Sequence, residues 1–299
     1  MMKTYVLYHA NCWDGFCAAW IARGCLDREA EFIPVQYGQL EPKIESGSIL
    51  FMLDFSYPRE QMRNLLSQMH RVIVLDHHKT SEAVLHGLTD EFVQRPDLIQ
   101  NIPGSELPVI HFDMDKSGAR LTWEHFYGNS GMSTPGLVDY TEDRDLWRWA
   151  LPGSKAVNAC LRSYPLDFKL WDTWGQLSPI DIAEVFFEQG KAILRRERQI
   201  IEDHLIKARE ITMDGHKILA VNATVLFSDI AGQLANDRPF GACYFDRADG
   251  KRQWSLRSRE GGIDVSEVAR RHGGGGHRNA AGFEQCMDHE PINTGKVVQ

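Results

Sequence analysis

Histidine and aspartate side chains stand directly after several apolar runs in the first half of the chain. They are His9, Asn11 and Asp14 after the run at 5–8, Asp54 after the run at 49–53, and the triplet Asp76-His77-His78 after the run at 72–75. Carboxylate and imidazole groups bind hard and borderline divalent cations, and imidazole also carries protons near neutral pH. These residue types therefore predict a metal centre.

Single members of this set also have structural explanations. Asp14 has the position of a helix N-cap and Asp54 that of a turn cap, so neither is informative alone. The triplet Asp76-His77-His78 is different, because packing does not account for two adjacent imidazoles and a carboxylate after a buried run. The triplet favours function.

A further source of carboxylates lies at 139–149, where acidic residues are mixed with tryptophans. In a structural interpretation, this stretch is an exposed charged helix with aromatic residues packed beneath it. In a functional interpretation, it supplies one more ligand to the metal centre, and Asp143 and Asp145 both suit that role.

The second half of the chain carries a glycine run, 273–276, directly before His277 and Arg278. Consecutive glycines expose backbone N–H groups to an anion without obstruction by a Cβ atom, as in phosphate-binding nests. A flexible linker is the alternative. It is disfavoured because the run lies between an amphipathic segment, 265–271, and a predicted strand.

The apolar periodicity places these residues on an open α/β sheet. Predicted strands at 5–9, 49–54, 72–76 and 109–112 alternate with predicted helices at 14–23, 58–69 and 117–127. In parallel sheets, ligands bind outside the carboxyl ends of the strands, so the aspartates and histidines are expected at one edge.

The remaining pattern predicts a second, smaller α/β domain. A long amphipathic helix at 178–209 is expected to connect the domains, with its apolar stripe in the core. Hairpins follow around Asp214-Gly215 and Asp249-Gly250, and the tail after Cys286 has no regular pattern. The predicted organisation is a catalytic domain at 1–177, a connecting helix at 178–209 and a substrate-binding domain at 210–299.

The composition is that of a globular chain of 299 residues, with 43% hydrophobic residues and a formal net charge of −8. This charge argues against a protein that coats long nucleic acid, which needs a broad basic surface, but it leaves short anionic substrates open. No window is apolar and long enough to cross a bilayer, and the first residues lack a secretory signal, so we expect a cytoplasmic protein without a membrane partner. The six cysteines lack a CxxC pair and are expected to be reduced thiols.

Together these residues resemble the DHH phosphoesterase superfamily, in the branch with a C-terminal DHHA1 domain. The similarity extends from His9 to about Phe283 and rests on Asp54, the Asp76-His77-His78 triplet and the 273–277 run in this order. Within the superfamily, the chain is most similar to nanoRNases and to phosphatases of 3'-phosphoadenosine-5'-phosphate.

The resemblance implies two divalent ions, Mn²⁺ first, with Mg²⁺ or Co²⁺ as alternatives. The implied metal ligands are His9, Asn11, Asp14, Asp54 as the bridging carboxylate, His77 and Asp143. The implied catalytic residues are His78, which contacts the scissile phosphate, and Asp76, which orients the imidazoles. The expected substrate-binding residues are Arg257, Gly274, Gly275, Gly276, His277 and Arg278.

The first motif departs from that of the relatives. They carry two aspartates there, whereas this chain has Asn11 or Cys12 at the upstream position, and we take Asn11 as the substitute. The first ion would then have fewer charged ligands, or the site would prefer another ion.

The expected activity is hydrolysis of phosphodiester or phosphomonoester bonds, with a short single-stranded oligonucleotide degraded from one end as the preferred substrate. Alternative substrates are 3'-phosphoadenosine-5'-phosphate, cyclic dinucleotides or their linear products, and polyphosphate, and a homodimer stays open. A nucleotide-binding sensor with a degenerate metal site is the alternative from another class. A plain two-domain scaffold would leave the ordered Asp and His residues unexplained.

Overall fold

The computed structural model describes residues 2–94 and 108–287 of the chain, so most of the tail after Cys286 lies outside the described residues. The chain divides into two compact units, Met1–Arg195 and Arg196–Gln299. The division falls inside the long helix α9, Pro179–Leu205, within the segment expected to connect two domains.

Unit 1 contains a five-stranded parallel sheet, called sheet A here, as predicted. Its strands are β1 (Thr4–His9), β2 (Glu31–Val35), β3 (Ile49–Leu53), β4 (Arg71–Asp76) and β5 (Val109–Phe112), in the order β2-β1-β3-β4-β5. The sequence did not predict β2, which contains Pro34. Because β2 is an edge strand, the missing N–H of this proline is tolerated there.

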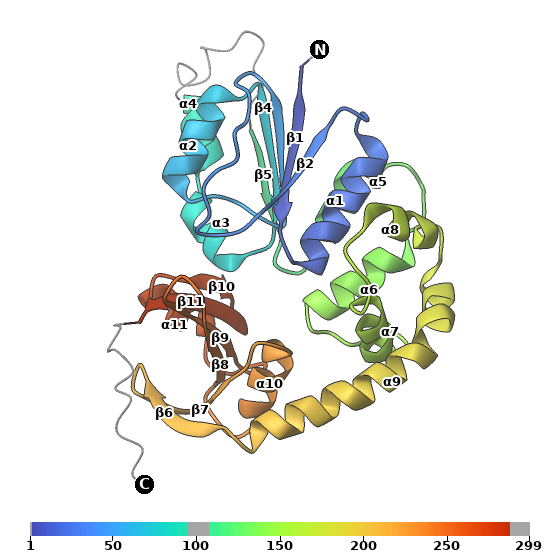
Figure 1. The fold of residues 1–299 in the computed structure, drawn as a ribbon. Helices are drawn as coiled ribbons and strands as arrows, with labels where there is room; N and C mark the ends of the chain where they lie inside the picture. The colour runs from blue at the N-terminus through green and yellow to red at the C-terminus, as the bar shows by residue number, and fades with distance from the viewer. Residues whose placement is uncertain (1, 95–107, 288–299) are drawn as a thin grey trace. The chain divides into compact units, whose positions relative to one another are not determined.

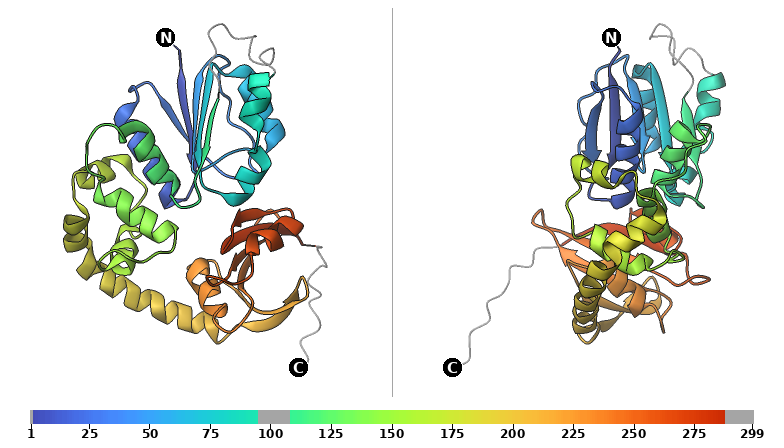
Figure 2. Two further views of the ribbon diagram at one scale, coloured as in Figure 1. Left: turned by 180° about the vertical axis from the view of Figure 1, so that it is seen from behind. Right: turned by 90° about the vertical axis from the view of Figure 1, so that its right-hand side faces the viewer.

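Helices cover both faces of sheet A, and Figures 1 and 2 show the sheet between them. On one face lie α2 (Arg59–Gln68), α3 (Lys79–Leu85) and α4 (Leu88–Gln94), and on the other lie α1 (Trp13–Cys25) and α5 (Gly118–Tyr127). Met62 and Leu65 pack on the first face, and Ala18 and Leu121 pack on the second. Both faces of the sheet are therefore buried in core. This packing holds the ends of the strands, where the candidate residues lie, in fixed positions.

A helical layer adjoins α1 and α5. It consists of α6 (Gly136–Asp145), α7 (Ser154–Leu161), α8 (Phe168–Trp174) and the first part of α9. Its core surrounds Trp171, Tyr140 and Phe186, which are almost completely buried. This layer brings the acidic helix α6 to sheet A.

Unit 2 is the smaller α/β unit and contains a six-stranded sheet, called sheet B here. Its elements are β6 (Arg209–Met213), β7 (His216–Asn222), α10 (Phe227–Leu234), β8 (Gly241–Asp246), β9 (Lys251–Arg257), α11 (Val265–Arg271), β10 (Gly275–His277) and β11 (Ala280–Cys286). The strand order is β10-β11-β9-β8-β7-β6, and only β7 and β8 are parallel among the paired strands of this sheet in the described ranges. Both predicted hairpins are present, with Asp214 and Gly250 at positive φ in their turns.

The two helices of unit 2 pack on opposite faces of sheet B. Helix α11 packs with Leu256 and Phe283, whereas α10 packs with Val221 and Cys243. Within the described ranges, no helix combines the length and the apolar character that crossing a bilayer requires.

Candidate metal centre

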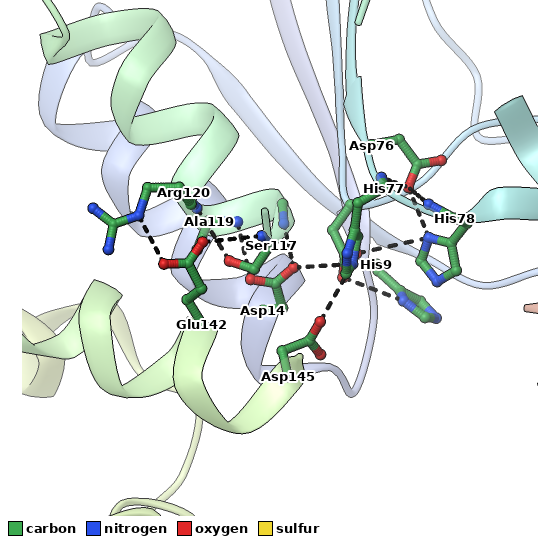
Figure 3. A network of polar contacts seen from close by, with 12 residues as sticks. His9, Asp14, Asp76, His77, His78, Ser117, Ala119, Arg120, Glu142 and Asp145 are labelled. Atoms are coloured by element: carbon green, nitrogen blue, oxygen red, sulfur yellow. Dashed lines mark hydrogen bonds and ion pairs between the residues drawn. The ribbon is translucent and has the colours of Figure 1, made fainter. Parts of the chain in front are cut away.

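The predicted residues of the first half meet at the carboxyl edge of sheet A. His9 and Asp76 are the last residues of β1 and β4, Asp54 directly follows β3, and Asp14 lies in the first turn of α1. Since β1, β3 and β4 are neighbours in the sheet, their ends deliver these side chains to one place. Figure 3 shows His9, Asp14, His77 and His78 gathered there.

The side chain of His77 lies among three carboxylates. Its Nε2 atom is 3.2 Å from Oδ1 of Asp54, 3.3 Å from Oδ2 of Asp145 and 3.5 Å from Oδ2 of Asp14. Burial by itself lowers the pKa of His77, but the carboxylates outweigh it and raise this pKa to about 10. Burial and the charges of Asp54 and Asp145 also raise the pKa of Asp14 well above its usual range. The negative charge here exceeds what one imidazole can balance.

The backbone adds to this negative field. Asp145 is the last residue of α6, and a carboxylate at a helix C-terminus is disfavoured by the partial negative charge of the helix dipole. Only 27% of its side chain is exposed, so solvent screens it incompletely. A bound divalent cation would balance this excess.

Three groups of potential ligands share the carboxylate of Asp54. Ligand atoms of Asp14, Asp54 and His77 lie within 4.8 Å of one another, and those of His9, Cys12 and Asp54 satisfy the same limit, as do those of Asp54, Asp76 and His78. In the third group, Asp76 and His78 are already bonded to each other. The shared carboxylate is the geometry that a pair of bridged metal ions requires.

The environment of Asp54 fits a cation. Its side chain is 1% exposed, and neither carboxylate oxygen accepts a hydrogen bond of acceptable geometry. Its backbone has φ of 54°, a left-handed conformation that is uncommon outside glycine. The nearest donors are imidazole nitrogens of His77 at 3.2 Å and His9 at 3.4 Å, which are poorly aligned. Buried acceptors that are poorly satisfied are costly, and strained backbone clusters at functional sites, so both observations point to a ligand on this carboxylate.

The carboxylate of Asp76 contacts the ring of His78. Its Oδ1 atom lies 2.7 Å from Nδ1 of His78 and accepts from the backbone N–H of His77 at 2.7 Å, while Oδ2 accepts from the hydroxyl of Ser56 at 2.9 Å. Burial alone would raise the pKa of Asp76, but His78 reverses the effect and lowers it. The bond to Nδ1 fixes the orientation of the ring.

The N-terminus of α5 holds Asp14. The backbone N–H groups of Gly118 and Ala119 donate to its two carboxylate oxygens at 2.6 and 2.9 Å, where the helix dipole favours an anion. A Cβ atom on Gly118 would lie 2.6 Å from Cβ of Asp54 and 2.9 Å from Oδ2 of Asp14. Glycine therefore permits the close approach of α5 to both carboxylates.

Two predicted ligands are placed differently by the structure. The carboxylate of Asp143 accepts the backbone N–H of Ala150 at 2.8 Å and that of Leu151 at 3.4 Å, so it shapes the turn after α6, whereas Asp145 is the carboxylate beside His77. Asn11 is exposed with φ of 55°, and Cys12 is the residue that joins His9 and Asp54. The structure therefore places Asp145 rather than Asp143 beside His77, and Cys12 rather than Asn11 beside His9 and Asp54.

The predicted substrate-binding residues lie in unit 2. Arg257 and His277 both pair with Ala280, one on each side, so the three residues form a row across β9, β11 and β10. Directly opposed residues of antiparallel strands point to the same face. The guanidinium of Arg257 donates to the hydroxyl of Ser228 on α10 at 2.6 Å, which fixes it beside this row.

The glycine run has a structural role as well. It forms the turn after α11 and strand β10, and a Cβ atom on Gly274 or Gly276 would collide with the backbone of β11. Arg278 is placed differently from Arg257 and His277, because it donates to the carbonyl of Gly262 at 3.1 Å and so braces the loop before α11.

Some residues of the centre were not predicted. Ser56 follows Asp54 by two residues, and its polar character after an apolar run was the available signal. Arg120 donates through Nε to Glu142 at 3.0 Å and ties α5 to α6, but nothing in the sequence relates these two distant residues. Figure 3 shows this link beside Asp14 and Asp145.

Comparison with known proteins gives the same picture. A family model described as the DHHA1 domain matches residues 218–287. The uncharacterized protein R106 of Acanthamoeba polyphaga mimivirus is 29% identical over 317 residues, covering 96% of this chain and 70% of R106. Oligoribonuclease NrnB of Bacillus subtilis (strain 168) is 28% identical over 308 residues, covering 93% of this chain and 72% of NrnB.

Solved structures also resemble the chain over most of its length. The pGpG-specific phosphodiesterase PggH from Vibrio cholerae has a TM-score of 0.46 at 13% identity, covering 96% of this chain and 94% of PggH. An uncharacterized protein from Helicobacter pylori G27 has a TM-score of 0.42 at 16% identity, covering 97% and 94%. The DHHA1 match at residues 218–287, the two relatives that align along almost the whole chain and the Asp76-His77-His78 triplet at the edge of sheet A all support the resemblance to the DHH phosphoesterase superfamily, in the branch with a C-terminal DHHA1 domain.

Proposed function

We propose that the chain is a phosphoesterase that depends on two divalent metal ions and hydrolyses the phosphodiester bonds of short single-stranded oligonucleotides from one end. The observation that carries the proposal is that two separate sets of ligands, Asp14 with His77 and His9 with Cys12, share the buried carboxylate of Asp54. Phosphoryl transfer needs charge stabilisation on both the attacking and the leaving oxygen, and a bridged pair of ions meets that need.

The residues of unit 1 have distinct roles in this proposal. Asp14, His77 and Asp145 would hold one ion, His9 and Cys12 would hold the other, and Asp54 would contribute to both. When bound, the ions supply charge stabilisation for the phosphoryl group and an ionised water at neutral pH. Mn²⁺ is the proposed physiological ion, with Mg²⁺ or Co²⁺ as alternatives.

His78 and Asp76 act on the substrate phosphate. Asp76 holds Nδ1 of His78 at 2.7 Å, so the ring is oriented before substrate binds. An imidazole that is fixed in this way contributes both a hydrogen bond and positive charge to a phosphate, and its reorganisation cost is small. Loss of an orienting partner of this kind typically lowers activity by about 10–100-fold.

The row of Arg257, Ala280 and His277 is the proposed substrate grip. Adjacent strands lie about 4.8 Å apart, so the two basic residues stand roughly 10 Å apart with a methyl group between them. A terminal phosphate or nucleotide fits between such groups without a basic exterior, which agrees with the net charge of −8. The similarity to Oligoribonuclease NrnB supports an oligonucleotide as the substrate.

An activity panel tests the proposal. Labelled oligonucleotides of two to five nucleotides, 3'-phosphoadenosine-5'-phosphate, a cyclic dinucleotide with its linear product and polyphosphate are each incubated with the protein and Mn²⁺. We expect stepwise release of mononucleotides, loss of activity with chelator, and loss in the variants Asp54→Asn and His78→Ala. The control is Asp172→Asn, an exposed carboxylate paired with Arg23, which should retain full activity.

Two outcomes would contradict the proposal. Hydrolysis of none of these substrates would remove the esterase assignment, and tight nucleotide binding without bound metal would favour the sensor. If polyphosphate or 3'-phosphoadenosine-5'-phosphate is hydrolysed fastest, the proposed role of the metal ions stands, but the proposed oligonucleotide substrate is wrong.

A further inference from the structure

The thiol of Cys12 lies inside the proposed metal centre. Its Sγ atom, a ring nitrogen of His9 and a carboxylate oxygen of Asp54 all lie within 4.8 Å of one another. The left-handed conformation of Asn11, with φ of 55°, leaves that residue exposed at the turn into α1, where Cys12 is the N-cap in extended conformation. The side chain of Cys12 makes no capping hydrogen bond of acceptable geometry to α1.

A second observation points to a ligand at this place. The carboxylate of Asp54 is buried and both of its oxygens lack a hydrogen bond of acceptable geometry, and the buried Nδ1 atom of His9 lacks one as well. Nδ1 of His9 and Oδ2 of Asp54 are 3.4 Å apart, and both residues belong to the ligand group that includes Cys12. Buried polar atoms of this kind are normally satisfied, and a cation between them would satisfy both at once.

We propose that the thiolate of Cys12 is a direct metal ligand, and that the two ion sites of the centre are therefore chemically different. This inference rests on the proposed two-ion function. The group His9, Cys12 and Asp54 provides nitrogen, sulfur and oxygen, a set that suits a borderline transition ion such as Zn²⁺ or Co²⁺ and disfavours Mg²⁺. The group Asp14, Asp54 and His77 is harder and accepts Mn²⁺.

The inference separates this centre from one built on carboxylates and imidazoles alone. An aspartate at position 12 would make both sites hard and similar, and both would then fill with Mn²⁺. With a thiolate, one site retains a borderline ion at concentrations of Mn²⁺ that fill the other. The ion occupancy of the purified protein is thus expected to be mixed.

Cobalt provides a direct readout that does not depend on catalysis. The metal-free full chain is titrated with Co²⁺ in buffer that contains a phosphine reductant to keep the thiols reduced. Absorption spectra are recorded for the wild type, Cys12→Ser, Cys12→Asp and Cys25→Ser. We expect a sulfur-to-cobalt charge-transfer band in the wild type and in Cys25→Ser, because Cys25 is exposed at the far end of α1, about 20 Å along the helix from Cys12. The band should be absent in both Cys12 variants.

Selectivity is measured on the same proteins. Each is dialysed against equal free Zn²⁺ and Mn²⁺, and bound metal is counted by mass spectrometry. Cys12→Asp should still bind two ions but retain at least tenfold less Zn²⁺ relative to Mn²⁺ than the wild type. Because Asp is a ligand as well, this variant stays informative if Cys12→Ser loses the site altogether.

The outcomes distinguish this inference from the function on which it rests. Two bound ions and phosphoesterase activity without a charge-transfer band, or a band that persists in Cys12→Asp, would overturn the role of Cys12 and leave the proposed function intact. No bound Co²⁺ or Mn²⁺ and no hydrolysis would overturn the proposed function itself. A band that disappears in Cys25→Ser would assign the sulfur elsewhere and refute the inference.

Discussion

Gly118 offers a sharp test of how the centre is assembled. In Gly118→Ala, the new Cβ atom would lie 2.6 Å from Cβ of Asp54 and 2.9 Å from Oδ2 of Asp14. Carbon atoms pack at about 3.5–4.0 Å, so the start of α5 and the Asp54 loop must separate by roughly 1 Å. Because Gly118 and Ala119 also donate to Asp14, the displacement moves two proposed metal ligands together.

A misplacement of roughly 1 Å near the reacting atoms typically costs about 100-fold in rate, which corresponds to about 2.7 kcal/mol of barrier. We expect Gly118→Ala to lower kcat/KM for the best substrate by about that factor and to weaken Mn²⁺ binding measured by calorimetry. Overpacking should also cost about 1–3 kcal/mol in the free energy of unfolding, measured in urea.

The matched control is Gly232→Ala in the interior of α10, where a new Cβ atom meets nothing within 4 Å. Alanine there should be neutral or stabilise the protein by up to about 1 kcal/mol. Wild-type kcat/KM and Mn²⁺ affinity in Gly118→Ala would refute the argument that this glycine sets the spacing of the centre.

Three further changes probe separate parts of the molecule. Asp145→Asn should weaken Mn²⁺ binding, measured by calorimetry, at least tenfold with little loss of stability. Asp143→Asn should instead lower the free energy of unfolding, measured in urea, by about 1–2 kcal/mol, because its carboxylate caps the turn after α6. Equal Mn²⁺ affinities of the two variants would contradict the assignment of Asp145. Ala280→Val should fill the space between Arg257 and His277 and raise KM for oligonucleotides about tenfold at unchanged Mn²⁺ affinity. An unchanged KM would show that the substrate is not bound at this row. Asp214 accepts from Arg271 at 2.7 Å, and this bond lowers its pKa below the ordinary value despite some burial. A lowered pKa stabilises the fold above the unfolded value of about 3.9 and ceases to do so as the pH falls through the folded value. Asp214→Asn should therefore lower the Tm at pH 7, by the equivalent of about 0.5–1 kcal/mol, and the difference should shrink below pH about 4; a difference that is constant with pH would refute this account.

The strand-end residues were predictable because parallel strands present their carboxyl ends at one edge. His9, Asp54 and Asp76 needed only the order of apolar runs and polar residues along the chain. Strand β2 was missed because its proline reads as a break, although an edge strand tolerates proline. The sequence carries no sign of which strand will be at the edge.

The choice between neighbouring residues was not predictable for a geometric reason. Asp143 and Asp145 are two residues apart on a helix, so their side chains point about 200° apart, and the packing of α6 decides which one meets His77. The left-handed backbone of Asn11 decides whether Asn11 or Cys12 faces His9 and Asp54, and a sequence pattern does not predict this conformation for asparagine. Single-residue assignments at turns and helix ends depend on tertiary packing.

Several unfavourable features of unit 1 converge within a few ångströms of Asp54. They include its own left-handed backbone, its unsatisfied buried oxygens, and a carboxylate of Asp145 at the negative end of α6. Each of these lowers stability, while the apolar cores on both faces of sheet A hold the arrangement in place. Several local rules that are broken together at one sheet edge indicate a site maintained for binding. A cation would relieve the charge excess and the poorly satisfied oxygens at the same time, so the energetics of the chain support the proposed metal centre independently of its similarity to known proteins.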